Sequence, residues 1–207
     1  MRRAELRGLY AITPDWPDTH RLLAVTEAIL DAGCRLLQYR HKRTSDCHRQ
    51  EQALALRRLT RQHGALLLIN DDVELARYSE ADGVHLGAED GSIEAARQRL
   101  GAEKILGVSC YQDSDLARKA AASGADYVAF GSFFPSLTKP QAHRAGLELL
   151  SADIGLPRCA IGGITLENAP PLVAAGADML AIITALYDAP DPARAARQFI
   201  QIIEEHA

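Results

Sequence analysis

The segment DYVAFGSFFPSLTKP, residues 126–140, begins as an apolar run and ends in two hydroxyl groups followed by a lysine. The hydroxyls belong to Ser136 and Thr138, and Lys139 is the only charged residue after Asp126 in this segment. Hydroxyl groups, backbone N–H groups and a lysine together form a phosphate cradle, because each donates a hydrogen bond to an anionic oxygen. We therefore predict a phosphate-binding loop that closes Lys139 over a charged substrate group.

Two more cations follow a second apolar run, RLLQYR, which spans residues 35–40. Arg40 and Lys42 at its end can each donate charge-assisted hydrogen bonds to phosphate. Each fits a solvated surface equally well, since charged side chains are mostly exposed in folded proteins. If the fold brings Arg40, Lys42 and Lys139 to one rim, their combined charge predicts a highly charged anionic ligand.

Carboxylates follow two other apolar runs, and they suit a divalent cation. Asp71 and Asp72 come directly after ALLLIN, and Asp90 comes shortly after GVHL. Mg²⁺ prefers oxygen ligands, retains several waters and commonly bridges carboxylates to substrate phosphate. We assign Asp71 and Asp90 to Mg²⁺, and we assign Asp72 to the cap of the helix that NDDVELARY begins.

The elements that must position these residues are short apolar runs that alternate with longer amphipathic stretches. Continuous apolar runs of this length suit strands that are buried on both faces of a parallel sheet. The stretches between them indicate helices, several with Ser or Asp near the start and Gly at the end. The predicted strands are residues 8–13, 35–40, 65–70, 83–86, 105–109, 127–131, 159–163 and 179–184.

Repeated strand–helix units with right-handed crossovers leave two architectures, a closed (β/α)8 TIM barrel and an open doubly wound sheet. Eight units favour the barrel, although 207 residues is near the lower size limit of that fold. An open sheet would usually carry a glycine-rich turn after its first strand, where this chain has TPDW. We predict an α/β fold with a single (β/α)8 barrel domain over residues 1–207, in which residues 1–7 form a short tail.

A barrel would bring the polar strand ends together, because active sites of this fold lie at the carboxyl ends of the strands. Glycines after the seventh strand, in AIGGIT, would let backbone N–H groups approach a phosphate. The loops after strands seven and eight are a common phosphate site of such barrels. Two phosphate sites that face one centre suggest a transferase that displaces pyrophosphate.

Composition and charge exclude several other classes of protein. The chain has 23 basic and 27 acidic residues, whereas proteins that bind nucleic acid need a basic face. No apolar run approaches the roughly 20 residues of a membrane helix, and the first residues, MRRAELRGLYAIT, lack the apolar core of a secretory signal. The four scattered cysteines lack metal-ligand spacing and indicate reduced thiols, several of them buried, in a cytoplasmic protein.

Eight segments, taken together, closely resemble the thiamine-phosphate synthase family, and they cover almost the whole chain. They are LYAIT, QYRHK, LLINDD, DGVHLGAED, GVSC, DYVAFGSFFPSLTK, AIGGIT and MLAIIT, in this order. The resemblance implies a (β/α)8 barrel, which is a homodimer in part of the family. It also implies that hydroxymethylpyrimidine pyrophosphate is joined to hydroxyethylthiazole phosphate with Mg²⁺-assisted release of pyrophosphate. These small molecules would be the partners, with neither nucleic acid nor a membrane involved.

The resemblance further implies a role for each matched position. Asp71 and Asp90 would ligate Mg²⁺, and the residues at the reacting groups would be Lys139, Arg40, Ser109 and His85. The pyrimidine pyrophosphate would be held by Gln38, Tyr39, Arg40, His41, Lys42, Asn70, Ser109 and Lys139. The thiazole phosphate would be held by Ser136, Leu137, Thr138, Gly162, Gly163, Ile183 and Thr184.

Three other functions use related arrangements. A thiazole tautomerase on the same barrel would lack the metal and pyrophosphate residues, which this chain has. A phosphosugar isomerase or aldolase would need a Schiff-base lysine or an acid–base pair on a strand, and no lysine falls in a predicted strand. A non-catalytic thiamine-phosphate binding protein would not need the cations on the pyrophosphate side, and product binding without turnover would indicate one.

Overall fold

The computed structural model describes residues 6–87, 91–135 and 144–206, which form a closed barrel of eight parallel strands. Each strand pairs with the next along the chain, and the last pairs with the first to close the ring. The strands are β1 (Gly8–Ile12), β2 (Leu36–Tyr39), β3 (Leu66–Asn70), β4 (Gly83–Leu86), β5 (Ile105–Tyr111), β6 (Tyr127–Phe130), β7 (Arg158–Ile161) and β8 (Met179–Ile182). The predicted barrel is confirmed, and the open sheet is excluded.

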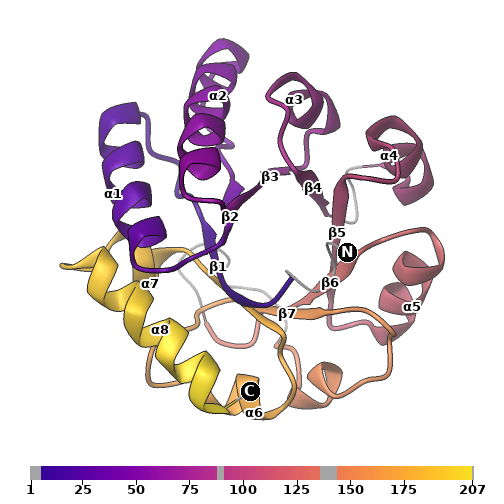
Figure 1. The fold of residues 1–207 in the computed structure, drawn as a ribbon. Helices are drawn as coiled ribbons and strands as arrows, with labels where there is room; N and C mark the ends of the chain where they lie inside the picture. The colour runs from indigo at the N-terminus through magenta and orange to yellow at the C-terminus, as the bar shows by residue number, and fades with distance from the viewer. Residues whose placement is uncertain (1–5, 88–90, 136–143, 207) are drawn as a thin grey trace.

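Helices surround the ring of strands (Figure 1). They are α1 (Thr19–Asp31), α2 (Asp46–Gln62), α3 (Val73–Tyr78), α4 (Ile93–Leu100), α5 (Ser114–Ala122), the 3-10 helix η2 (Leu147–Leu150), α6 (Pro170–Ala174), α7 (Thr184–Tyr187) and α8 (Pro192–His206). The last helix, α8, lies beside the first, α1, which closes the outer layer of helices (Figure 1). Within the described residues, none of these helices has the length and apolar character needed to cross a membrane.

Two apolar clusters hold the strands, because successive side chains of a strand point to opposite faces. The smaller cluster fills the barrel interior and includes Tyr10, Leu68 and Met179. The larger one lies between the strands and the helices. Leu6, which the sequence assigned to a tail, is 1% exposed and belongs to the interior cluster, so the predicted tail is wrong at this residue.

Three aspartates secure the amino-terminal end of the barrel by the same contact. The backbone N–H groups of Asp82, Asp126 and Asp178 each donate to a carbonyl of the preceding strand. Each carboxylate accepts the N–H of the same facing residue, at distances of 2.9, 3.0 and 2.8 Å respectively. Because each pair of residues exchanges two hydrogen bonds, the start of each even-numbered strand from β4 onward is fixed against the strand before it.

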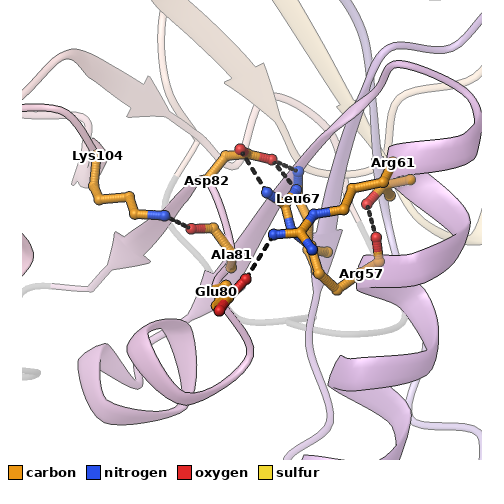
Figure 2. A network of polar contacts seen from close by, with 8 residues as sticks. Arg57, Arg61, Leu67, Glu80, Ala81, Asp82 and Lys104 are labelled. Atoms are coloured by element: carbon orange, nitrogen blue, oxygen red, sulfur yellow. Dashed lines mark hydrogen bonds and ion pairs between the residues drawn. The ribbon is translucent and has the colours of Figure 1, made fainter.

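An arginine from α2 completes the first of these contacts. The Arg57 guanidinium binds Asp82 in a fork, with Nη1–Oδ2 at 2.6 Å and Nη2–Oδ1 at 3.2 Å (Figure 2). The two side chains are only 13% and 11% exposed. Nearby, Arg61 pairs with Glu80 at the surface. The helix and the start of β4 are thus joined by one ion pair that is largely removed from water and one that is not.

Replacement of Asp82 by alanine is expected to lower the free energy of unfolding by about 3–5 kcal/mol, because Arg57 would remain buried without its counter-charge. The backbone N–H of Leu67 would lose its acceptor as well. Chemical denaturation measures the loss. The matched control is Glu80→Ala, which removes an exposed ion pair and should have a much smaller effect. Equal losses in the two variants would contradict this account.

Candidate active site

A cavity of about 580 Å³ opens at the carboxyl ends of the strands, and every strand or the loop after it contributes to its lining. This is the end of the barrel at which active sites of this fold lie. Most of the described residues that the sequence singled out are brought together here. They are Gln38, Arg40, Lys42, Asn70, Asp71, His85, Ser109, Gly162, Gly163, Ile183 and Thr184.

Tyr39 and His41 are placed elsewhere. The Tyr39 hydroxyl donates to Gln52 of α2 at 2.9 Å, so this side chain points out of the barrel. Both residues are buried, and both line a smaller outer cavity of about 230 Å³ instead of the main one. Both side chains therefore point away from the main cavity, as alternation along β2 requires for Tyr39, and their assignment to the pyrimidine substrate stays a prediction.

Five predicted site residues lie outside the described residues. They are Asp90, Ser136, Leu137, Thr138 and Lys139. Gly87 and Pro135, the last described residues before the two segments concerned, both line the main cavity. The roles assigned to these five residues stay predictions.

The two described cations at the cavity each contact a carboxylate. The Arg40 Nη1 atom lies 3.0 Å from Asp15 Oδ1, and Lys42 Nζ lies 3.0 Å from Asp71 Oδ2. Asp15 also accepts the backbone N–H of Lys42 at 3.0 Å, so it fixes the loop that carries both cations. The sequence analysis missed this role, and the acidic residue in TPDW directly after β1 was the available signal.

The sequence predicted different roles for the neighbouring residues Asp71 and Asp72, and the structure confirms the role of Asp72. Asp72 is the N-cap of α3 and accepts the N–H of Leu75 at 2.8 Å, which confirms the predicted cap. Asp71 has a φ of 63°, a left-handed conformation that Asp and Asn tolerate better than most residues. Its N–H donates to the carbonyl of His85 at 2.8 Å, so the turn holds the Asp71 carboxylate at the cavity.

The donor set at Asp71 fits Mg²⁺ in part. A carboxylate at the mouth of a cavity, with Asn70 beside it, supplies the oxygen ligands that Mg²⁺ prefers. Within the described ranges, no three His, Cys, Asp or Glu side chains gather closely enough to hold a metal by themselves. Asp71 would therefore need further oxygen ligands, from Asp90, water or substrate.

The floor of the cavity carries a chain of polar contacts that the sequence analysis only partly foresaw. His85 Nε2 lies 2.9 Å from Ser109 Oγ, and His85 Nδ1 lies 2.8 Å from the hydroxyl of Tyr127. That hydroxyl lies 2.9 Å from the hydroxyl of Tyr10, which accepts from Gln38 Nε2 at 2.7 Å. The missed signal was a tyrosine within each of two buried strands, because a buried phenol needs a hydrogen-bond partner.

Burial sets the protonation of these groups. It lowers the pKa of His85 to about 4, with a smaller opposing effect from the charge of Asp71. It raises the pKa of Tyr10 and of Tyr127 above their usual range. The imidazole and both phenols are therefore uncharged at neutral pH and act as hydrogen-bonding groups.

Two glycines after β7 let the chain pass close to the loop after β6. Gly162 and Gly163 have φ values of 105° and 64°, which favour glycine. A Cβ atom at Gly162 would collide with Ser132, and one at Gly163 would collide with the carbonyl of Pro135. Asn168 holds the turn by donating to the carbonyl of Gly163 at 3.0 Å. Backbone atoms, with no intervening side chain, therefore face the cavity at this point.

A closed barrel whose cavity at the carboxyl ends of the strands carries charged and polar side chains defines a (β/α)8 barrel enzyme. Residues 9–186 match the family model described as thiamine monophosphate synthase. The chain is 54% identical to the thiamine-phosphate synthase of Methylobacillus flagellatus over 199 residues, 95% of each protein. It is 55% identical to that of Thiobacillus denitrificans over 194 residues, 92% of each.

A solved structure agrees with these sequence relatives. The thiamine phosphate pyrophosphorylase from Pyrococcus furiosus matches with a TM-score of 0.84 and 35% identity, over 97% of this chain and 96% of that one. The chain therefore belongs to the thiamine monophosphate synthase family and is a transferase, as its motifs indicated.

Proposed function

We propose that this protein joins hydroxymethylpyrimidine pyrophosphate to hydroxyethylthiazole phosphate, giving thiamine phosphate and pyrophosphate. The observation that carries the proposal is the convergence of Arg40, Lys42 and Asp71 on the cavity that Gly163 and Thr184 also line. The chain belongs to this family, and its cavity has cations and a carboxylate on one side and phosphate-type loops on the other. This arrangement suits two phosphorylated substrates.

The reaction proceeds by departure of pyrophosphate first. The bond between the exocyclic methylene carbon and the pyrophosphate oxygen breaks, and its electron pair leaves with the oxygen. The electron-rich aminopyrimidine ring stabilises the resulting cation, and the lone pair of the thiazole nitrogen then forms the new carbon–nitrogen bond. That nitrogen has no proton to lose, so no strong base is required. This agrees with the neutral, hydrogen-bonded state of His85.

Negative charge grows on the leaving pyrophosphate, so the groups that bind it there accelerate the reaction. Arg40 uses one N–H group on Asp15, and a guanidinium has five N–H donors, so others can face an anionic oxygen. Lys42 and Lys139 would add two positive charges. When bound, Mg²⁺ would neutralise further charge on the pyrophosphate oxygens. Asp71 and Asp90 would hold it.

The thiazole phosphate would lie against the loops after β6, β7 and β8. Gly162 and Gly163 bring main-chain atoms to the cavity, which supports a contact between backbone N–H groups and phosphate. Ile183 and Thr184 face the same cavity from the start of α7. Ser136, Leu137 and Thr138 would complete this side of the site.

Removal of divalent metal is expected to abolish synthesis. Enzyme incubated with both substrates and Mg²⁺ should form thiamine phosphate, detected by mass spectrometry, and a chelator should stop it until excess Mg²⁺ is restored. Unchanged synthesis in chelator would refute the metal assignment. Product binding without synthesis would instead indicate a binding protein, and isomerisation of the thiazole alone would indicate a tautomerase.

We further propose that the protein acts in the cytoplasm and assembles as a homodimer. Free thiols support the compartment: Cys34, Cys110 and Cys159 are buried and unbridged, and burial raises the pKa of Cys110 to about 12. The dimer rests on the family resemblance alone, which implies a homodimer for part of the family. Light scattering of the purified protein would measure its mass in solution.

A further inference from the structure

A continuous chain of hydrogen bonds crosses the barrel interior from β2 to β5. It joins Gln38, Tyr10, Tyr127, His85 and Ser109 through contacts of 2.7 to 2.9 Å. Gln38 and Ser109, at its two ends, both line the main cavity. Tyr10 and Tyr127 are 1% and 0% exposed, so neither hydroxyl can exchange its partner for bulk water.

Each hydroxyl in this series of hydrogen bonds can donate only one proton, and this limit determines the direction of every hydrogen bond in the series. Tyr10 accepts from the amide nitrogen of Gln38, so the proton of Tyr10 must find another acceptor. Within the described part of the chain, the remaining partner of Tyr10 is the hydroxyl of Tyr127. Tyr10 therefore donates to Tyr127.

The same reasoning fixes the histidine. Tyr127 accepts from Tyr10, and its own proton goes to its other partner, His85 Nδ1. A ring nitrogen that accepts carries no proton, so the imidazole holds its proton on Nε2. That proton is donated to Ser109 Oγ at 2.9 Å.

The two ends of this series of hydrogen bonds, Ser109 and Gln38, then present opposite kinds of group to the cavity, a donor and an acceptor. Ser109 accepts from His85, so its own proton is available to a ligand acceptor. Gln38 donates an amide N–H to Tyr10, which orients the amide and leaves its carbonyl oxygen available to a ligand donor. An aminopyrimidine has both required groups, since its amino group donates and its ring nitrogens accept.

We propose that Tyr10 and Tyr127 are positioning residues that fix this polarity and so select an aminopyrimidine over its oxo analogue. The inference rests on the proposed function, because it concerns the orientation of the pyrimidine substrate. An oxo group in place of the amino group would put an acceptor against the acceptor of Gln38. Sites built to bind a donor reject ligands that lack one.

The decisive variant is Tyr127→Phe, which removes the donor to His85 Nδ1 together with the acceptor of the Tyr10 proton. Nitrogen-15 NMR of the histidine rings reports the tautomer directly, with the His85 signal assigned by its loss in His85→Asn. We expect wild-type His85 to carry its proton on Nε2 and Tyr127→Phe to shift the Nδ1 signal. We also expect the KM for the pyrimidine substrate to rise about 10-fold, while the KM for the thiazole substrate stays unchanged.

The matched control is Tyr187→Phe. Tyr187 is also buried, and its hydroxyl contacts Thr26 outside the barrel at 3.1 Å. This variant therefore loses a buried hydroxyl but leaves the hydrogen bonds between Gln38 and Ser109 unchanged. It should leave the His85 signal and both KM values as in the wild type. Equal rises in both KM values for Tyr127→Phe would show a merely structural effect and overturn the inference.

The NMR measurement separates this inference from the proposed function, because it needs no turnover. A proton on Nδ1 of His85 in the wild type would overturn the proposed polarity whatever the enzyme catalyses. If synthesis is absent but His85 carries its proton on Nε2, the proposed function fails and the hydrogen-bond direction stands. Equal use of the oxo analogue and the natural pyrimidine by wild type would overturn the selectivity.

Discussion

Replacement of Lys139 by alanine is expected to reduce turnover by about 100- to 1000-fold, the usual effect of losing one preorganised group that stabilises charge in a transition state. The negative charge that develops on departing pyrophosphate would lose one of its counter-charges, whereas the ground state loses less. The measurement is kcat for thiamine phosphate formation at saturating concentrations of both substrates and Mg²⁺. The unfolding midpoint should not change, because charged side chains are mostly exposed in folded proteins and seldom support the core.

The control for this variant is Lys119→Ala, which removes an equal charge from the exposed surface of α5. It should leave kcat unchanged. If Lys139→Ala retains near-normal turnover, the proposed role of this lysine is refuted, even though the chain still belongs to the family.

The second large effect is expected for Asp71→Asn, which should reduce kcat by about 100-fold or more and raise the Mg²⁺ concentration needed for activity. Asparagine tolerates the left-handed conformation at this position, with its φ of 63°, so the loop should keep its shape while the charge is lost. The same change removes the counter-charge of Lys42, which lies 3.0 Å away. Initial rates measured across a series of Mg²⁺ concentrations separate weaker metal binding from slower chemistry.

Asp72→Asn is the matched control, since it makes the same chemical change one residue further on. Asn is as good an N-cap as Asp, so α3 should remain capped and activity should stay close to that of the wild type. Equal activity losses at the two positions would mean that the effect is one of general charge and would contradict a metal-binding role specific to Asp71.

The barrel could be predicted from the chain because its signals are local. Each strand is an apolar run with polar neighbours, and the observed β4 at Gly83–Leu86 coincides with the predicted one. Other strands differ at their ends: β5 extends to Tyr111, two residues beyond the prediction, and β7 begins at Arg158. Strand ends depend on the hydrogen bonds of neighbouring strands, which local patterns do not contain.

The sequence could not predict which side chains around β2 face the cavity. Both faces of a barrel strand are apolar, so the run around Tyr39 does not reveal which alternate side chains point inward. Gln38 and Arg40 face the cavity, while Tyr39 and His41 face α2. Only closure of the barrel, which sets the register of β2 against β1 and β3, decides between the two faces.

By itself, the sequence determined the number and order of the strands and the chemistry gathered at their carboxyl ends, since residue types and spacing are properties of the chain. The tertiary structure decided which of those side chains meet. Tyr10 and Tyr127 are 117 residues apart, yet their hydroxyls lie 2.9 Å apart, and Asp15 meets Arg40 across two strand ends. Such contacts form only when the barrel closes, because the two partners lie in distant segments of the chain. Neither segment by itself indicates that the contact will form.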